Sequence, residues 1–314
     1  MSSVDRSPLI RAPQWQLYLK LIAVAFFWGG TFIAGRHLAP DVPPHLAAIG
    51  RFGIAAILLV ILVVRKHAGW VWISPSQLLY TAIMGFTGIC IYNLFFLGAL
   101  NYIEAGRSAL FVSLSPVMTV VAAAIIFKEK LSKLNYFGVL LAFLGTIIVV
   151  SRGQFSSLLD GAFGQGEAMM SGAVCCWVIY TLCIRKVAPL SAQLTTTYAI
   201  LWGLLFLLVS AIPQLESWQA IHISTMNWLA MLYLGALGTV LAFVWYAQGI
   251  EQIGASRTVI FNNLVPCFAV ILSFFLLKET VTWAMLLGGI FCFAGVILTN
   301  KKAKSGSTVQ HQQE

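Results

Sequence analysis

Long apolar runs alternate with short polar stretches along almost the whole chain. Most runs are close to the roughly 20 residues that a helix needs to cross a bilayer. No stretch between them is long enough for a soluble domain. We therefore predict an all-α polytopic membrane protein with ten transmembrane helices, at about 17–38, 45–64, 77–99, 105–127, 134–151, 166–186, 193–212, 226–248, 256–277 and 283–299.

The second half of this pattern repeats the first. Eight positions from Arg107 to Gly145 recur 150 residues later, and four positions from Trp28 to Pro40 recur 149 residues later. Each copy holds five helices, an odd number, so the two copies enter the membrane from opposite sides. We predict two inverted five-helix repeats, at 17–151 and 166–299, with tails at 1–16 and 300–314.

Composition and charge support a membrane protein and add its orientation. Hydrophobic residues make up 60% of the chain and charged residues 9%, with a mean hydropathy of +0.89. The net charge of +9 is spread over short clusters between apolar runs, which argues against nucleic-acid binding. With a cytoplasmic N-terminus, 14 of the 19 Lys and Arg residues lie on the cytoplasmic side. This bias predicts that both termini are cytoplasmic.

The repeated motifs resemble the EamA repeat of the drug/metabolite transporter superfamily. In each copy a proline is followed by a Lys-Glu step and a helix with two glycines. The first copy has Pro116, Phe127-Lys128-Glu129, Gly138 and Gly145, and the second has Pro266, Leu277-Lys278-Glu279, Gly288 and Gly295. The segments Phe27-Trp28-Gly29-Gly30-Thr31 and Arg51-Phe52 match two further family features. The resemblance implies a multi-pass carrier of the cell inner membrane, usually an exporter, with its cavity between the halves.

Polar and aromatic side chains at mid-membrane depth are the candidate substrate contacts. An amide or indole N–H in hydrocarbon needs a hydrogen-bond partner, which a wet cavity or a substrate could supply. Each of these side chains could instead hold helices together. The candidates are Trp28, Thr31, Tyr92, Asn93, Ser113, Trp177, Tyr180, Trp245, Asn262 and Asn263.

Two prolines are candidate gates. Pro116 and Pro266 each remove a helical hydrogen bond and free a carbonyl one turn earlier, at Val112 and Asn262. Kinks related by the inverted repeat could open the cavity to opposite sides.

The charged residues near helix ends leave two interpretations open. Arg51 could anchor the protein to lipid headgroups or bind a carboxylate, and its equivalent in the second copy is Ile200. Glu129 and Glu279 are expected to pair with a loop or to cap the next helix. Because no predicted helix carries Asp, Glu, Lys or Arg near its middle, we expect a cavity without a fixed charge.

Together these features predict a secondary transporter that functions as a monomer and exports a small neutral or zwitterionic metabolite such as an amino acid. The alternatives are a carrier of nucleotide sugars or sugar phosphates and, in another class, a non-transporting membrane protein. The six cysteines have neither metal-site nor redox spacing, and no catalytic constellation or nucleotide-binding loop is present. No enzyme activity, metal or cofactor is expected.

Overall fold

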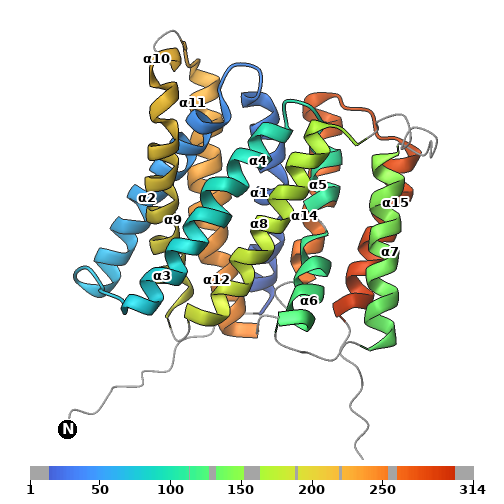
Figure 1. Cartoon of the computed structure of the whole chain (residues 1–314), viewed down its shortest axis with the longest axis horizontal. Helices are drawn as coiled ribbons and strands as arrows, with labels where there is room; N and C mark the ends of the chain where they lie inside the picture. The colour runs from blue at the N-terminus through green and yellow to red at the C-terminus, as the bar shows by residue number, and fades with distance from the viewer. Residues whose placement is uncertain are drawn as a thin grey trace, which may run out of the picture.

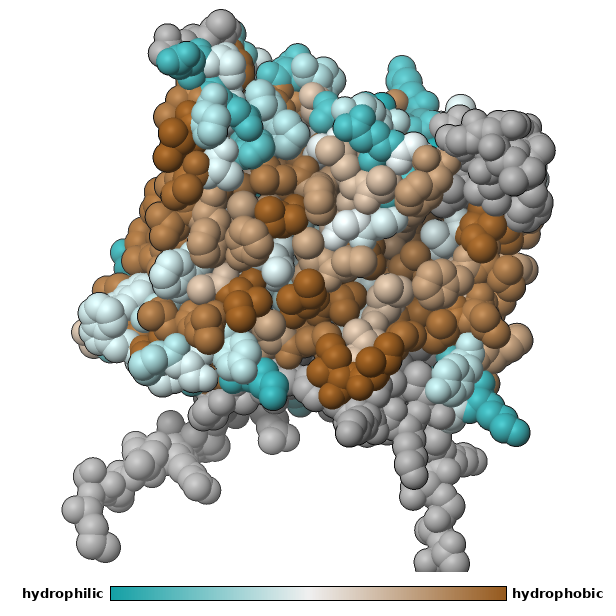
Figure 2. Space-filling model, viewed as in Figure 1, coloured by the Kyte–Doolittle hydropathy of each residue, from teal (hydrophilic) through white to brown (hydrophobic). Residues whose placement is uncertain are grey.

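The protein is described by a computed structural model that covers residues 14–112, 114–126, 132–151, 163–187, 190–218, 221–253 and 260–300. Its helices form a bundle, with their axes running in roughly the same direction (Figure 1). Apolar side chains form a belt around the middle of the visible face, and polar ones gather at its two ends (Figure 2). Large apolar residues such as Ile57, Leu140 and Leu276 are more than 60% exposed. This surface is the one that lipid covers.

Ten spanning segments confirm the predicted helix count within the described residues. Six helical runs of at least 18 residues are long and apolar enough to cross a membrane by themselves. The first half holds α1 (Gln14–Leu38), α2 (Pro44–His67), α3–η1–α4 (Pro75–Met84, Gly85–Ile91, Tyr92–Ala99), α5–α6 (Ala105–Val112, Ser115–Ile126) and α7 (Lys133–Val150). The second holds α8 (Gln165–Val187), α9 (Ala192–Ala211), α11–η4–α12 (Thr225–Leu232, Tyr233–Leu241, Ala242–Ile253), η5–α14–η6 (Ile260–Asn263, Leu264–Leu272, Ser273–Leu277) and α15 (Trp283–Asn300). A short η3–α10 segment (Ile212–Gln214, Leu215–Trp218) follows α9.

Four spans are interrupted, and they are the third, fourth, eighth and ninth. The third and eighth contain wide π-helical turns, η1 and η4, at equivalent places in the two repeats. The fourth is divided just before Pro116, and the ninth begins with a 3₁₀ turn that ends three residues before Pro266. A proline in a helix removes one backbone hydrogen bond, so the interruptions of the fourth and ninth spans have a local cause.

The two halves interlock. The first helix of the first half, α1, packs against α12 and α14 of the second half. Its counterpart α8 packs against α3, α4, α5 and α6 of the first half. Each half therefore completes the packing of the other, and the middle of the molecule is lined by both.

The fifth helices of the two repeats, α7 and α15, pair closely at one side of the molecule (Figure 1). Their contact is made by the repeated glycines. A Cβ on Gly145 would lie 2.5 Å from the carbonyl oxygen of Gly288, and one on Gly295 would lie 2.6 Å from that of Gly138. Small residues allow this close backbone approach in a membrane, where packing drives helix association.

We predict that Gly145→Ala lowers the thermal stability of the purified protein, because the new methyl group must push backbone away. Overpacking of this kind costs about 1–3 kcal/mol. Gly53→Ala is the matched control, since a Cβ at Gly53 meets nothing within 4 Å. Equal melting temperatures for the two variants in detergent would contradict the close contact.

Candidate substrate-binding site

A cavity of about 140 Å³ lies between the two halves. It is smaller than the roughly 300–1,000 Å³ of pockets for drug-sized ligands, so it suits a small metabolite. Helices α1, α2, α4, α5, α6, α8, α12, η5 and α14 contribute to it. The lining residues are Trp28, Thr31, Phe32, Arg51, Tyr92, Phe96, Ala109, Val112, Ser115, Trp177, Phe243, Asn262, Val265 and Pro266.

The break in the fourth span brings a polar group to the cavity wall. The Ser115 hydroxyl donates a 2.6 Å hydrogen bond to the Val112 carbonyl, one of the two that the prolines were predicted to free. Both residues line the cavity. On the other side, Asn262 lies in the 3₁₀ turn before α14, and its amide donates to the Tyr246 hydroxyl at 3.4 Å. Interrupted helices are tolerated in membranes where side chains satisfy the freed backbone groups, as Ser115 does at Val112.

The π-helical turns supply hydrogen-bond acceptors beside the cavity. In η4, the Gly238 carbonyl accepts a 3.0 Å bond from the Trp28 indole, and the Leu234 carbonyl accepts from the Thr239 hydroxyl at 2.8 Å. In η1, the Ile89 carbonyl accepts from the Asn93 amide at 2.9 Å. π turns often occur at functional sites because they break the regular hydrogen-bond ladder. Here they orient the side chains that surround Arg51.

Arg51 is a buried cation in the cavity wall, with 8% of its surface exposed. Its Nε donates to Thr239 Oγ1 at 3.1 Å, and its Nη1 donates to Asn93 Oδ1 at 3.0 Å. The guanidinium also lies 4.9 Å from the centre of the Phe52 ring. The expectation of a cavity without charge is therefore wrong. Arg51 lies two turns inside α2, and the interrupted helices bring the cavity to that depth.

Aromatic rings form much of the remaining wall. The Trp28 ring is 5.7 Å from Phe243 and meets it edge to face. Tyr92 stacks on Phe96 with centroids 5.9 Å apart and lies 5.4 Å from Trp177. Such pairs hold one another in fixed orientations. The cavity thus presents apolar ring faces around a single guanidinium.

The structure brings together half of the ten predicted contact residues. Trp28, Thr31, Tyr92, Trp177 and Asn262 all line the cavity. Asn93 lies behind the wall, where it holds Arg51.

The other predicted residues lie elsewhere or are not described. Tyr180 is buried against Gly88 and stacks on Trp177 with centroids 5.0 Å apart. Trp245 lies beside Lys20 and Phe27, outside the cavity lining. Ser113 and the side chain of Asn263 lie outside what the structure describes. Of the two predicted gates, Pro266 lines the cavity, and Pro116 is the second residue of α6.

Several lining residues were not among the ten predicted contacts. They include Phe32, Phe96, Phe243, Ser115 and Arg51, for which carboxylate binding was one of two interpretations. Phe32 follows Thr31 directly, and Phe96 is one turn after Tyr92. An apolar residue within a turn of a candidate carries no signal by itself, since apolar residues fill every span. Arg51 did carry a signal, because it is an arginine two turns inside an apolar helix.

A larger hollow of about 500 Å³ lies between α14 and α15. Residues such as Val270, Leu286, Ile290 and Phe293 line it, and no charged or hydrogen-bonding side chain apart from cysteine does. Volume alone would favour it as a binding site. We assign the site to the smaller cavity, because only that one has groups that could orient a polar solute.

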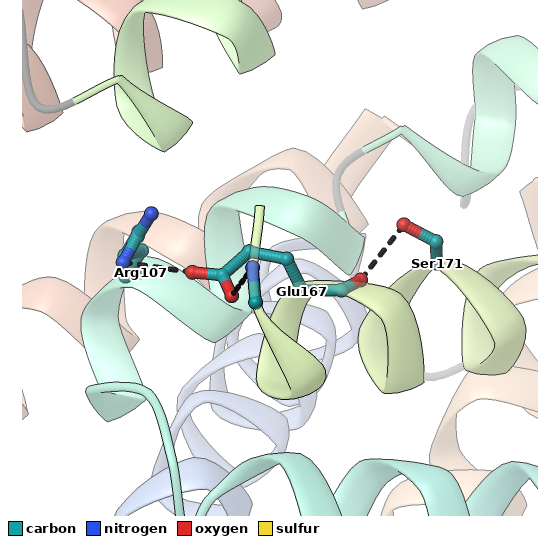
Figure 3. Close-up of polar contacts among 4 residues, drawn as sticks. Arg107, Glu167 and Ser171 are labelled. Carbon is teal, nitrogen blue, oxygen red and sulfur yellow. Dashed lines mark hydrogen bonds and ion pairs between the residues drawn. The ribbon is translucent and has the colours of Figure 1, made fainter. Parts of the chain in front are cut away.

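Near one end of the bundle, a buried ion pair joins the two halves. Arg107 Nη1, at the start of α5, lies 2.8 Å from Glu167 Oε1, in the first turn of α8 (Figure 3). The second carboxylate oxygen of Glu167 accepts from the Gly164 N–H at 3.0 Å. The Ser171 hydroxyl donates to the Glu167 carbonyl at 2.8 Å (Figure 3). Both charged side chains are at least 94% buried.

Glu279 links the two repeats at the same end of the bundle as the Arg107–Glu167 pair. Its carboxylate oxygens accept from the Ala105 and Gly106 N–H groups, at 3.0 and 3.2 Å, so it caps the start of α5. An anion at a helix N-terminus is favourable. The capped helix belongs to the other repeat and is not the helix that follows Glu279. Glu129, the equivalent residue, lies outside the described residues.

Two inverted five-helix repeats that enclose a cavity at interrupted spans define a membrane transporter. The profile of the EamA-like transporter family matches residues 15–151 and 164–301. The chain belongs to this family, which is a family of transporters and not of enzymes.

Comparisons with known proteins agree. The uncharacterized transporter YyaM of Bacillus subtilis (strain 168) is 30% identical, over 82% of this chain and 85% of its own length. The uncharacterized transporter YetK of the same strain is 26% identical, over 93% and 88%. An uncharacterized transporter of Archaeoglobus fulgidus is 28% identical, over 91% and 97%. A protein of known crystal structure, 19% identical, has the same fold, with a TM-score of 0.63 over 90% of this chain and 96% of that one.

We predict that Glu167→Ala destabilises the protein by about 3–5 kcal/mol, because it leaves the Arg107 charge buried without its carboxylate. The double variant Arg107→Met/Glu167→Leu should recover most of this loss, since the charge is then removed as well. Glu216→Ala, at an exposed position in α10, is the control. The free energy of unfolding in detergent is measured for all three variants. A double variant as unstable as Glu167→Ala would contradict this account of the pair.

Proposed function

We propose that the protein is a secondary carrier that exports a small neutral or zwitterionic metabolite, such as an amino acid, from the cytoplasm. The observation that carries this proposal is the cavity shared by the two halves. It lies where four spans are interrupted, the usual place for substrate sites in inverted-repeat transporters. It is lined by rings and by a few polar groups, which suits a solute with an apolar body and a polar head.

The inverted repeat supports alternating access. If the two halves adopt slightly different conformations, exchange of those conformations turns an opening on one side into an opening on the other. The fourth and ninth spans, divided next to Pro116 and Pro266, are the flexible elements. Because both halves of one chain complete the cavity, one chain is sufficient for transport.

The orientation follows from the distribution of Lys and Arg. An even number of spans returns the chain to the face where it started, and the positive bias places that face in the cytoplasm of an inner-membrane protein. A fluorescent or alkaline phosphatase reporter fused after Glu314 tests this. In that orientation the Arg107–Glu167 pair closes the outer end. Its release is then part of the outward-opening step.

The runner-up is a carrier of nucleotide sugars or sugar phosphates. A phosphate carries about −1.5 to −2 charges, and such groups are usually held by several cations. The described lining offers one, Arg51, in about 140 Å³. The cavity therefore favours a small neutral or zwitterionic solute over one that carries a phosphate.

Counterflow into proteoliposomes tests transport itself. Compounds are chosen by a screen for metabolites whose toxicity falls when the chain is overproduced. We expect radiolabelled compound to accumulate in vesicles preloaded with the same unlabelled compound, and not in empty ones. Equal uptake into both kinds of vesicle, for every compound from the screen, would contradict the proposal.

We predict that Pro116→Ala and Pro266→Ala each lower counterflow several-fold while membrane abundance changes little. Alanine restores the missing backbone hydrogen bond and stiffens the span at its break. Pro213→Ala, at an exposed position in η3, is the control. Counterflow per carrier is compared after quantitation of the protein. Unchanged rates in both variants would contradict the gating role.

A further inference from the structure

The charge of Arg51 is only partly satisfied by the protein. A guanidinium has five N–H donors, and the hydrogen bonds to Thr239 and Asn93 use two of them. Both acceptors are neutral, and Phe52 covers one face of the group. Among the described residues, Arg51 Nη2 has no hydrogen-bond partner, and the one ion pair is Arg107–Glu167. A cation is thus held at the cavity wall without a counter-ion from the described part of the chain.

A buried cation without a counter-ion costs free energy unless an anion compensates its charge. Transfer of a charged side chain to the bilayer interior costs at least about 2.5–3.5 kcal/mol on insertion scales. An intramembrane charge of this kind is normally paired or faces a functional pathway. Arg51 faces the cavity, and the described lining residues include no carboxylate. The compensating anion must then come from the cavity contents.

The inverted repeat shows that the scaffold does not need these polar groups. The residues equivalent to Arg51, Asn93 and Thr239 in the opposite repeat are Ile200, Phe243 and Ile89. Ile200 and Ile89 are buried in the apolar core, with 0% and 3% exposed. The same three positions therefore pack well with apolar side chains. The Arg51–Asn93–Thr239 trio is confined to one side of a cavity whose framework is symmetric.

We propose that Arg51 binds the carboxylate of the transported solute, so that the substrates are small carboxylates with an apolar or aromatic body. The free Nη2 donors give a charge-assisted hydrogen bond, and the guanidinium plane matches the geometry of a carboxylate. Thr239 and Asn93 fix the orientation of the guanidinium from behind. The rings of Trp28, Tyr92 and Phe243 lie around the space left for the body.

The inference rests on the proposed transport function and makes the carboxylate, rather than a net charge of zero, the feature that its substrates share. One fixed positive charge balances one carboxylate. A phosphate dianion would leave net negative charge in a cavity of about 140 Å³. A compound that has only an ammonium group would place a second positive charge beside Arg51. Amino acids and their deaminated acids fit, whereas amino acid amides and aryl phosphates do not.

Thermal-shift binding to the purified chain tests the proposal without a known substrate. The probes are L-phenylalanine, 3-phenylpropionate, phenylalaninamide and phenyl phosphate, with L-leucine, 4-methylpentanoate and leucinamide as an aliphatic set. We expect at least one carboxylate in a set to raise the melting temperature, and its amide partner and phenyl phosphate to have no effect. This comparison uses the unmodified protein, so it does not depend on whether a variant folds.

Variants then assign the effect to Arg51. In Arg51→Gln the apparent affinity for the carboxylate should fall at least about tenfold, equivalent to about 1.4 kcal/mol. Arg51→Lys should keep part of it, since the charge remains without the planar fork. Arg65→Gln removes the same charge from an exposed position on the same helix and should bind as the unmodified protein does.

Two sets of results would overturn the inference. In the first, no carboxylate stabilises the protein more than its amide or phosphate counterpart. In the second, Arg51→Gln binds the carboxylates as tightly as Arg65→Gln does. Counterflow distinguishes a failure of the Arg51 inference from a failure of the proposed transport function. Counterflow of solutes without a carboxylate refutes the role of Arg51 alone, whereas carboxylate binding that depends on Arg51, without counterflow of any bound probe, refutes transport alone.

Discussion

A guanidinium that is buried inside a membrane must be hydrogen-bonded and electrically compensated, and much of the cavity is arranged to meet the first demand. Thr239 and Asn93 hold Arg51, and each of them is held in turn by a carbonyl of a π-helical turn. Those turns lie at equivalent places in the two repeats. The irregular backbone of the third and eighth spans thus supplies the carbonyls that hold the two side chains bonded to Arg51.

Residues that the two repeats share and residues that differ between them have different roles in the fold. Repeated glycines let α7 and α15 approach closely, and the first helix of each half packs into the other half. Those shared features build the framework. The features that differ lie at the cavity or at one end of it. The Arg51 trio has apolar equivalents, and Glu279 has its counterpart Glu129 in a Lys-Glu step followed by further lysines.

The fold could be predicted from the sequence because hydrophobic length and an odd-numbered repeat leave few alternatives in a bilayer. The cavity could be predicted only in part. Depth in the membrane can be estimated from position along a helix, and Trp28, Trp177 and Asn262, placed at mid-depth in this way, line one cavity. The direction in which a side chain points is not readable in the same way, because a π turn shifts the helical phase of every residue after it. Asn93, which follows η1, therefore lies behind the wall, and Phe243, which follows η4, lies in it.

The role of Arg51 also could not be decided from its position in the sequence. Its distance from the start of α2 fitted anchoring at a helix end as well as a role in binding. What decides between them is the position of the cavity, which depends on contacts among helices far apart in the chain. Sequence spacing does not contain that information.

The most direct test of the central claim is a structure of the purified protein with a heavy-atom carboxylate, 3-(4-bromophenyl)propionate, located by the anomalous signal of its bromine. The account predicts the carboxylate at Arg51 Nη2 and the bromophenyl ring among Trp28, Tyr92 and Phe243. It would be contradicted by a ligand that lies only in the apolar hollow between α14 and α15, or by one in the cavity whose carboxylate points away from Arg51.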